Sequence, residues 1–539
     1  MASEAPTVFV RKASGLVREI GVIDTLFYNI GITNFGIGVS TLVAWAYFVA
    51  PGSSVPGVVI ISLLIASIPG ALLWSAYSAM MPRTGGDYVV TSRVAHPLLG
   101  FWSSWGESIP NAIWAGASAA FLPAFTMYGS FTIMGSLTKN DALVTFGNQM
   151  ATPTYSIIVG TIALALTFIL MNISVRAIFR VQNVILPIAL LGAVVSIGLL
   201  AVSTNADFIA RFNAYAQPFT GSSDYYHEII NMSKGAGYNV APPVSLLATL
   251  IAFPIGSFNL GDVMWSSYQS GETKNVARTQ AIGMIGAAIV TTTLYLLATT
   301  LLTNVAGYEF LNALSFQMYS GQGTLKIPVY PYFNFLVSLL SDNIIVVGII
   351  AVSFICWGWL YIYPVVFMPV RSFFAWSFDR SFPAAIAHVS RRNSPIVASA
   401  VAIAIAEVML IVYSFGSGLY LTMGIALLLL PGFTVPGLVG IYVPFSKYRE
   451  LYKSCWLSKL DIGPIPAMTI CGILNAATNI IGFFAVLLNP LYGANTPLSM
   501  IAWFILGVPI PIIIYLATRS YYRRKGIDVD LAFAELPPA

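Results

Sequence analysis

The chain has 539 residues, of which 57% are hydrophobic and only 8% are charged, and its mean hydropathy is +0.81. A water-soluble domain carries about 25% charged residues. This composition therefore excludes a water-soluble protein and predicts a chain that crosses a membrane many times. The formal net charge of +5 does not indicate a nucleic-acid partner, because the basic residues are distributed as in a membrane protein.

Apolar runs predict about twelve transmembrane helices, since a helix needs about 20 apolar residues to cross a bilayer. In chain order these runs are 20–49, 56–80, 98–128, 154–172, 181–202, 244–268, 281–303, 340–370, 395–413, 417–443, 466–488 and 498–518. The expected fold class is an all-α polytopic membrane protein. The first run is too long for a signal peptide and lacks a small-residue cleavage site, so we expect it in the mature protein.

The distribution of lysine and arginine predicts the orientation of the chain. With the amino terminus inside, about 21 of the 25 basic residues fall in cytoplasmic segments, as the positive-inside rule requires. The four that fall outside are Lys139, Arg211, Lys234 and Lys326. We therefore expect a multi-pass plasma-membrane protein whose segment 1–19 and tail 519–539 are cytoplasmic. An N-x-S sequon at Asn231 lies in a predicted outer loop and is a candidate glycan site.

Two stretches interrupt predicted helices with residues that suit a regular helix poorly. Residues 28–38 in the first run contain three glycines and two asparagines, and residues 252–261 in the sixth contain a proline and two glycines. Within a membrane, irregular backbone is tolerated only where it is buried in protein or lines a cavity. A matched pair of interrupted spans indicates the binding site of a transporter. The alternative is that the glycines only allow close helix packing.

Four stretches, in this order along the chain, carry a family resemblance. They are LVREIGVIDTLFYNIGITNFGIG from residue 16, PRTGGDYVVTSRVAHPLLGF from 82, YQSGETKNVARTQAIG from 268 and VRSFFAWSFDRSFPAAIAHVSRRNSPIVAS from 370. Together they resemble the amino acid-polyamine-organocation superfamily of permeases, in its amino acid permease branch. The resemblance implies a leucine-transporter-like fold, with inverted five-helix repeats at 20–203 and 244–444 and with helices 1 and 6 unwound in mid-membrane. Helices 11 and 12, at 445–518, would be peripheral.

The same resemblance implies a binding site at the two interruptions. The first would hold the carboxylate of an amino acid, and carbonyl groups at both would hold its ammonium group, which suits the exposed N–H and C=O ends of half-helices. The implied carboxylate residues are Thr33, Asn34, Phe35 and Gly36, the implied carbonyl residues are Ile30, Phe253 and Gly256, and Phe258 would be an aromatic gate. A phenylalanine that packs in the core or against lipid is the alternative for Phe258. Asn259 departs from the acidic residue that many relatives carry nearby.

Three carboxylates lie within predicted spans and more than five residues from the nearest span end, where a charge is costly and a function is the first hypothesis. They are Glu107, Asp262 and Glu407. Glu107 is the coupling candidate, either as a proton carrier or as the partner of a cation, and its alternative is a neutral acid hydrogen-bonded to a neighbouring helix. We expect Asp262 and Glu407 to be structural. Two coupling signatures of relatives are missing, because Ser353 is followed by Phe354 instead of a second hydroxyl and the fifth span holds no lysine.

Charged residues in two cytoplasmic loops offer an ion-pair latch. Asp87 and Arg93 precede the third span, and Asp379 and Arg380 follow the eighth. Exposed ion pairs contribute less than about 1 kcal/mol, so a solvated loop is the alternative. The three cysteines and three histidines show no ligand spacing, and we expect neither a metal nor a cofactor.

The expected function is secondary active transport of amino acids by alternating access, and not enzyme catalysis. The expected partners are an amino acid substrate, the lipid bilayer and, as one option for coupling, a proton. Transport of a polyamine or another organic cation stays open and would be favoured by a cavity-facing Glu107. A membrane receptor or non-transporting subunit also stays open, although it would not need two interrupted helices at depth.

Overall fold

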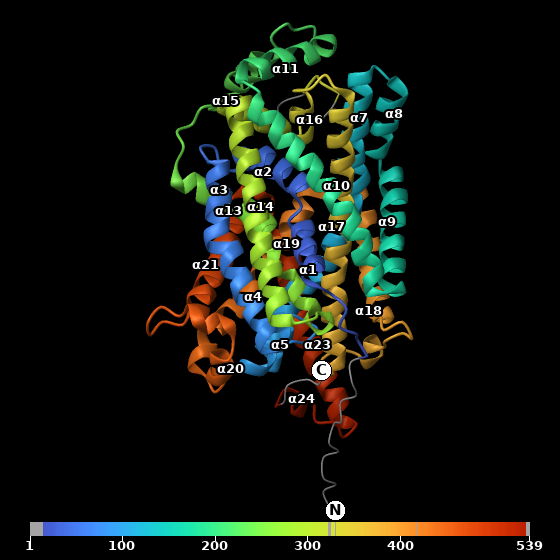
Figure 1. Cartoon of the computed structure of the whole chain (residues 1–539), viewed down its shortest axis with the longest axis vertical. Helices are drawn as coiled ribbons and strands as arrows, with labels where there is room; N and C mark the ends of the chain where they lie inside the picture. Colours follow the sequence, from blue (N-terminus) through green and yellow to red (C-terminus); the bar gives the residue numbers. More distant parts are fainter. Residues whose placement is uncertain (1–14, 322–324, 329, 417, 535–539) are drawn as a thin grey trace, which may run out of the picture.

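The computed structural model describes residues 15–321, 325–328, 330–416 and 418–534, so the expected cytoplasmic termini lie partly outside the described residues. The helices run mostly along the long axis and form one bundle (Figure 1). The described chain begins and ends at the same end of this bundle, which we call the terminal end (Figure 1). The other end, where α11, α15 and α16 lie, is called the distal end.

The regular elements are helices, and within the described ranges the only β pairing is two isolated bridges. The first half of the chain contains α1 (Val22–Thr33), α2 (Phe35–Val49), α3 (Val55–Ser62), the π-helical η1 (Leu63–Ser67), α4 (Ile68–Met80), α5 (Asp87–Val94), α6 (Pro97–Phe121), the π-helical η2 (Leu122–Met127), α7 (Tyr128–Thr138), α8 (Asp141–Met150), α9 (Pro153–Ile173), α10 (Val175–Val202), α11 (Asn205–Thr220) and α12 (Tyr225–Gly235).

The second half follows with longer membrane helices and short connecting turns. It contains α13 (Leu246–Leu260), the 3-10 helix η3 (Gly261–Glu272), α14 (Val276–Ala306), α15 (Tyr308–Tyr319), α16 (Phe333–Ser338), α17 (Ile344–Phe378), η4 (Ala384–Ala387), α18 (Ile396–Phe415), α19 (Gly418–Tyr442), η5 (Val443–Phe445), α20 (Arg449–Lys453), η6 (Trp456–Leu460), α21 (Ala467–Leu488), η7 (Pro490–Tyr492), α22 (Pro497–Gly507), α23 (Pro509–Arg524) and α24 (Leu531–Ala534).

Eleven helices in the described part of the chain are long and apolar enough to cross a membrane. The one predicted span without a counterpart among these eleven is the third, 98–128, which corresponds to α6 and η2 and is helical there. This span is less apolar than the others because α6 carries polar side chains that include Ser103, Ser104, Glu107 and Asn111. The predicted all-α polytopic class is therefore confirmed, whereas the five-plus-five repeat stays a prediction.

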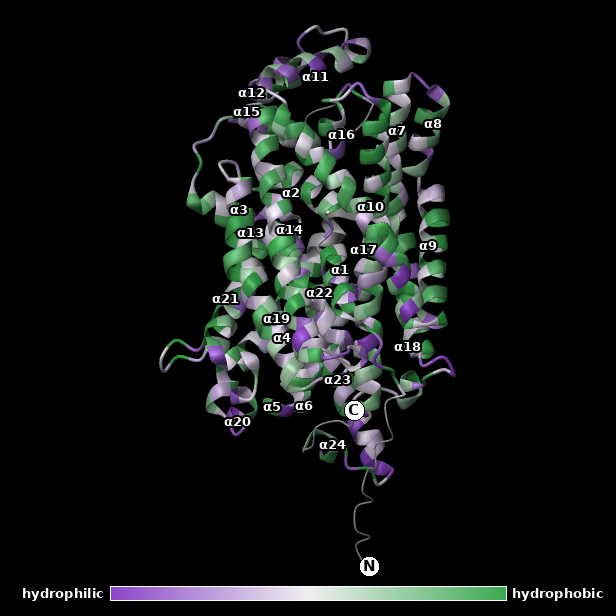
Figure 2. Ribbon diagram, viewed as in Figure 1, coloured by the Kyte–Doolittle hydropathy of each residue, from purple (hydrophilic) through white to green (hydrophobic). Residues whose placement is uncertain are grey.

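The outside of the bundle is apolar between its two ends. Figure 2 shows hydrophobic residues along the long helices and hydrophilic ones concentrated at α11, α12 and α20. On α9, Ile158, Ile162, Leu166 and Ile169 are each about half exposed. Because α9 holds this apolar face outward over successive turns, the face suits contact with lipid tails.

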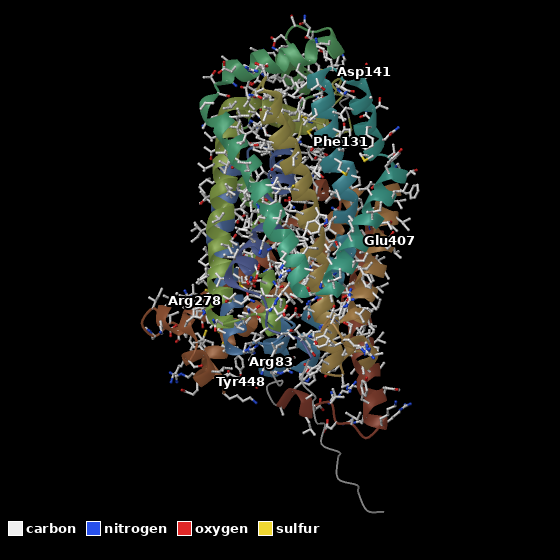
Figure 3. All side chains as sticks on the ribbon, turned by 45° about the vertical axis from the view of Figure 1, so that its right-hand side comes forward. Arg83, Phe131, Asp141, Arg278, Glu407 and Tyr448 are labelled. Atoms are coloured by element: carbon white, nitrogen blue, oxygen red, sulfur yellow. The ribbon has the colours of Figure 1, made fainter. Side chains whose placement is uncertain are left out.

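Most of the charged and polar side chains labelled in Figure 3 lie toward the two ends of the bundle. Arg83, Arg278 and Tyr448 lie at the terminal end, Asp141 lies at the distal end, and Glu407 lies between them (Figure 3). The sequon residue Asn231 is on α12, where it is exposed. This distribution of polar and apolar residues is that of a multi-pass membrane protein.

Glycines let several helices approach closely in the middle of the bundle. A Cβ atom on Gly116 of α6 would lie 2.6 Å from the backbone nitrogen of Leu410 on α18. Between α19 and α21, a Cβ atom on Gly437 would lie 3.0 Å from the carbonyl oxygen of Gly472. Such contacts use van der Waals packing, which holds helices together where burial from water supplies no driving force between them.

Two buried ion pairs hold the terminal end together. Arg371 on α17 makes a two-pronged contact with Glu272 at the end of η3, with distances of 3.0 Å from Nε to Oε1 and 2.9 Å from Nη2 to Oε2. Arg93 on α5 pairs with Asp379 after α17 at 2.9 Å. The second pair belongs to the predicted latch, but Asp87 makes a different contact, described below. Both pairs are almost fully buried.

The Arg371–Glu272 pair predicts a large stability effect. Glu272→Gln should leave the fully buried guanidinium without its counter-ion, which costs about 3–5 kcal/mol when one partner of such a pair is lost. We expect a clearly lower midpoint of thermal unfolding for the purified protein in detergent. Glu450→Gln is the matched control, because Glu450 forms an exposed pair with Lys453 and exposed pairs contribute little. Equal shifts in the two variants would contradict the structural role of the buried pair.

Candidate functional site

The first predicted interruption is present and lies at one residue. Helix α1 ends at Thr33, α2 begins at Phe35, and Asn34 between them has the left-handed conformation, with φ 45° and ψ 76°. Asparagine is one of the few residues other than glycine that tolerate this conformation. Its side-chain Oδ1 accepts a hydrogen bond from the N–H of Ile37 at 3.0 Å, so Asn34 also caps α2.

The polar groups at this hinge already have protein partners. The hydroxyl of Tyr295 on α14 lies 2.6 Å from the carbonyl oxygen of Thr33 and 3.0 Å from that of Asn34. The side-chain amide of Asn34 donates to the carbonyl of Trp357 on α17 at 2.7 Å. The carbonyl of Ile30 accepts from the Thr33 hydroxyl at 2.8 Å. The side-chain hydroxyl of Tyr295 on α14 and the backbone carbonyl of Trp357 on α17 therefore pair with polar groups that lipid would leave unpaired.

Aromatic rings cover the first residues of α2. The ring of Phe35 packs against those of Tyr295, Phe333 and Trp357, with centroids 5.6 to 6.1 Å apart. A Cβ atom on Gly36 would lie 2.8 Å from the Trp357 side chain, so only glycine fits there without a shift of that ring. The predicted carboxylate residues 33–36 are thus together at the hinge, but Trp357 and Tyr295 fill the space around them.

The second predicted interruption differs from the expectation. Residues 252–260 are α-helical, with Pro254 inside α13, and the helix changes to the 3-10 form only at Gly261. Gly256 faces α3, where an added Cβ atom would lie 2.7 Å from the hydroxyl oxygen of Ser62. Gly256 therefore allows α13 and α3 to pack closely, which is the alternative given above for these glycines. The neighbouring Phe253 side chain is fully buried.

A cavity of about 270 Å³ lies beside the hinge and along α13. More than half of the residues that line it are aromatic, namely Trp45, Trp114, Phe121, Phe125, Phe258, Trp265, Tyr319, Tyr330, Tyr332, Tyr361 and Tyr413. The predicted gate residue Phe258 is among them, whereas the other predicted binding residues are not. The cavity is in the size range of a small-molecule site.

Stacked rings line the distal part of this cavity. Phe125 stacks on Tyr332 with centroids 3.9 Å apart, and Tyr332 stacks on Tyr330 at 5.3 Å. Tyr330 is 44% exposed, so the lining reaches the surface on the side where α15 and α16 lie (Figure 1). The cavity therefore extends from the level of the hinge toward the distal end.

Few polar groups line the cavity. They include Thr41, Asn111, Asn259 and Asp262, and none of the described lining residues is Lys, Arg or His. Asp262 is the one carboxylate among them. In the 3-10 helix η3, residues three apart share a face, which brings Asp262 and Trp265 to the cavity together.

The sequence analysis expects a structural role for Asp262, and the structure shows this residue in the cavity wall. A carboxylate inside an apolar span is the sequence signal that would have made Asp262 a candidate site residue. What the sequence did not reveal is the change of helix type at Gly261, which decides the direction of the side chains that follow.

The coupling candidate Glu107 lies next to the cavity but does not line it. Asn111, one turn further along α6, lines the cavity and donates its side-chain amide to the carbonyl of Glu107 at 2.7 Å. The Glu107 carboxyl is fully buried and contacts the hydroxyl of Tyr268 on η3. The same hydroxyl lies 2.7 Å from Oδ1 of Asp87 at the start of α5.

The third carboxylate in a span, Glu407, belongs to a different part of the bundle. It lies on α18 and accepts a hydrogen bond from the hydroxyl of Thr161 on α9. Figure 3 places it near mid-height of the bundle. Among the described residues, no group of three or more His, Cys, Asp or Glu side chains is arranged to hold a metal ion.

Comparison with known proteins identifies the family. The family model described as "Amino acid permease" matches residues 20–510, which is most of the chain. No curated protein matches the chain. The family and the many apolar helices together make this a multi-pass membrane transporter. The chain belongs to the amino acid permease family.

Proposed function

We propose that the chain is a secondary active transporter that moves amino acids across the plasma membrane by alternating access, with both termini in the cytoplasm. The observation that carries this proposal is the cavity of about 270 Å³ beside the Asn34 hinge. Its lining reaches the distal side, while buried ion pairs close the terminal end. A cavity accessible from one side is what an alternating-access cycle requires in one of its states.

The orientation is supported by charge. Arg83 and Arg278 lie at the terminal end (Figure 3), and loops rich in Lys and Arg stay in the cytoplasm. The distal end would then face outward, so the cavity described above corresponds to a state that faces the outside. Asn231 on α12 would be on the same outer side.

The hinge remains the proposed carboxylate site. Thr33, Asn34, Phe35 and Gly36 place the start of α2, with its N–H groups, close to the cavity residue Ile37. The start of a helix favours an anion. Substrate binding there would require the Trp357 ring to move away from Gly36, since the two are in close contact. Carbonyls of Ile30, Phe253 and Gly256 stay the proposed partners of the ammonium group.

Uptake into proteoliposomes tests the proposal directly. Purified protein should exchange internal for external labelled L-amino acids at a rate far above that of empty liposomes. A receptor or non-transporting subunit would give no exchange with any amino acid or amine, and that result would overturn the proposal.

A second candidate is transport of an organic cation, and one observation favours it. Asp262 is the one carboxylate in the cavity wall, and the other lining groups are mostly aromatic rings. A carboxylate with aromatic faces around it suits an ammonium group, because both attract a positive charge. The sequence analysis linked transport of an organic cation to a cavity-facing Glu107. Glu107 does not line the cavity.

Asp262→Asn separates the two candidates. If the substrate is a cation paired with Asp262, the variant should lose a charge-assisted hydrogen bond of about 1.5–3 kcal/mol, which is about a tenfold to hundredfold rise in KM. A neutral amino acid should be affected much less. Competition assays with amines and with neutral amino acids give the comparison, and Glu407→Gln is the control because it removes a carboxylate outside the cavity. Unchanged KM values for every substrate would remove Asp262 from the site.

Gly36→Leu tests the hinge. The new side chain would collide with Trp357, whose ring lies 2.8 Å from the Cβ position, so we expect transport to be abolished while the protein still folds. Folding is checked by size-exclusion chromatography in detergent. In the double variant with Trp357→Ala the collision is relieved, and recovery of uptake would show that Gly36 serves packing only. Continued loss is expected if the substrate must approach the Gly36 backbone. Normal uptake by the Gly36→Leu single variant would contradict both the packing role and the substrate-binding role of Gly36.

Phe258→Ala tests the gate. The ring lines the cavity and is only partly buried, so its loss should widen the passage and increase KM or substrate leak. Initial-rate uptake and efflux from loaded proteoliposomes measure the two effects. Phe253→Ala is the comparison, because that ring is fully buried away from the cavity lining and should affect stability instead. If Phe258→Ala shows the wild-type KM and the wild-type leak rate, the Phe258 ring is not a gate and serves only in packing.

A further inference from the structure

Two buried carboxyl groups share one tyrosine hydroxyl between the cavity and the terminal end. Asp87 begins α5, Glu107 lies on α6 and Tyr268 lies on η3, so three separate elements meet here. The Tyr268 hydroxyl lies 2.7 Å from Asp87 Oδ1 and is also hydrogen-bonded to Glu107 Oε2. Trp74 on α4 donates its indole N–H to Asp87 Oδ1 at 3.3 Å. We call Asp87, Tyr268 and Glu107 the carboxyl cluster.

The hydrogen atoms in the carboxyl cluster can be counted. A tyrosine hydroxyl has one proton and can donate it to one acceptor, while an ionised carboxylate only accepts. Tyr268 contacts two carboxyl groups, so one of the two contacts needs a proton on a carboxyl oxygen, which then donates to the tyrosine oxygen. With both acids ionised, two negative charges would face each other through a single hydroxyl in a buried site, which is strongly unfavourable.

The oxygens not used in these contacts are also unpaired. Asp87 Oδ2 and Glu107 Oε1 are buried and have no hydrogen-bond partner in the structure. A negative charge spread onto such oxygens would lack the compensation that buried charges need. Burial accordingly raises the pKa of the Asp87 carboxyl above its usual range.

The basic side chains on α5 and α17 have acidic partners of their own. Arg93 on α5 pairs with Asp379, and Arg371 on α17 pairs with Glu272. Tyr77 on α4 is a titratable neighbour, and its hydroxyl donates to the carbonyl of Pro436 at 2.6 Å. On α19, a Cβ atom added at Gly432 would lie 2.9 Å from Glu107 Cγ.

The remaining charged side chains on elements packed against α5, α6 and η3 have other environments. Three of them have side-chain partners elsewhere: Asp24 on α1 accepts a hydrogen bond from Asn183, Glu407 on α18 accepts one from Thr161, and Arg519 on α23 pairs with Asp530. Asp262 lines the cavity, and Arg278 on α14 lies at the terminal end. Arg523 and Arg524 belong to the last turn of α23. The two contacts of the Tyr268 hydroxyl thus call for a proton on one of the two acids.

The cluster is joined to the elements that close the terminal end. The N–H of Gly85 donates to the carbonyl of Tyr268 at 3.0 Å, and a Cβ atom on Gly86 would lie 2.8 Å from the Tyr268 ring. Helix α5 thus holds Asp87 in the cluster at its first residue and Arg93 in the ion pair with Asp379 near its last. Separation of η3 from α5 and α6 would break the cluster and free α5 on one side.

We propose that the carboxyl cluster holds one proton, shared between Asp87 and Glu107 through Tyr268, while the terminal end is closed, and that release of this proton accompanies opening of that end. The proposal rests on the proposed transport function and assigns it a coupling proton. The proton moves from a carboxyl O–H to water on the cytoplasmic side, and two carboxylates remain. Their repulsion then disfavours return of η3 until a proton binds again.

Infrared spectroscopy on the full-length protein in liposomes tests the bound proton without a substrate. The wild type should show a protonated-carboxyl band that disappears as the pH is raised. Asp87→Asn and Glu107→Gln should each remove it, because the new amide donates to the Tyr268 oxygen and the other acid becomes ionised. Glu407→Gln is the control and should keep the band.

Two spectroscopic outcomes would overturn the proposal. One is a wild-type spectrum in which this pH-dependent band is absent. The other is a band that survives in either Asp87→Asn or Glu107→Gln, which would show a proton that belongs to a single acid. The two variants are independent tests. If one of them does not fold, the infrared spectrum of the other still decides whether the proton is shared.

Transport measurements test the coupling. With a labelled mixture of L-amino acids, both variants should keep exchange at wild-type rates and lose accumulation driven by a proton gradient. Accumulation at the wild-type level in both variants would overturn the coupling role. Absence of amino acid uptake by the wild type would instead overturn the proposed function, and the infrared band would still decide whether the cluster holds a proton.

Discussion

The structure depends on the requirement that backbone N–H and C=O groups buried at membrane depth find partners. At Asn34 the first membrane helix stops and restarts, which removes regular helix hydrogen bonds at the level of the cavity. The hydroxyl of Tyr295 on α14 donates to the Thr33 carbonyl instead, the carbonyl of Trp357 on α17 accepts from the Asn34 side-chain amide, and the side-chain oxygen of Asn34 caps the second segment. The interrupted helix is therefore held by contacts with two other membrane helices, and these contacts place its second segment against the cavity.

The two ends of the bundle contain different kinds of interaction. On the distal side the cavity is bounded by stacked rings, which separate without leaving charges behind. On the terminal side the Arg371–Glu272 and Arg93–Asp379 pairs are buried, and separating a buried pair exposes each charge to a cost of several kcal/mol unless water reaches it. Opening of the terminal end therefore has to admit water as the helices move.

Part of this arrangement could be predicted from the sequence. The glycines and asparagines of residues 28–38 marked the hinge, because few other residues adopt its conformation, and loop charges suggested the Arg93–Asp379 pair. Pro254 was misleading, since α13 continues through it and the change of helix type comes at Gly261. That change sets the directions of Asp262 and Tyr268.

Other contacts depend on residues far apart in the chain. Asp87, Glu107 and Tyr268 come from three elements, and Arg371 meets Glu272 across 99 positions. Their residue types signalled a function or an ion pair, but sequence spacing alone cannot give the partner. The family motifs covered each of these positions except Glu107 without specifying which of them touch.

Helix α17 spans 35 residues, from Ile344 to Phe378, and takes part in both the hinge and the closed end. Trp357 and Arg371 are fourteen positions apart, which is about 21 Å along a helix axis. Between them the carbonyl of Pro364 accepts a hydrogen bond from Tyr28 of α1, at 3.1 Å. If α17 tilts as one body about this contact with α1, a tilt that moves Trp357 away from Gly36 would also displace Arg371 from Glu272.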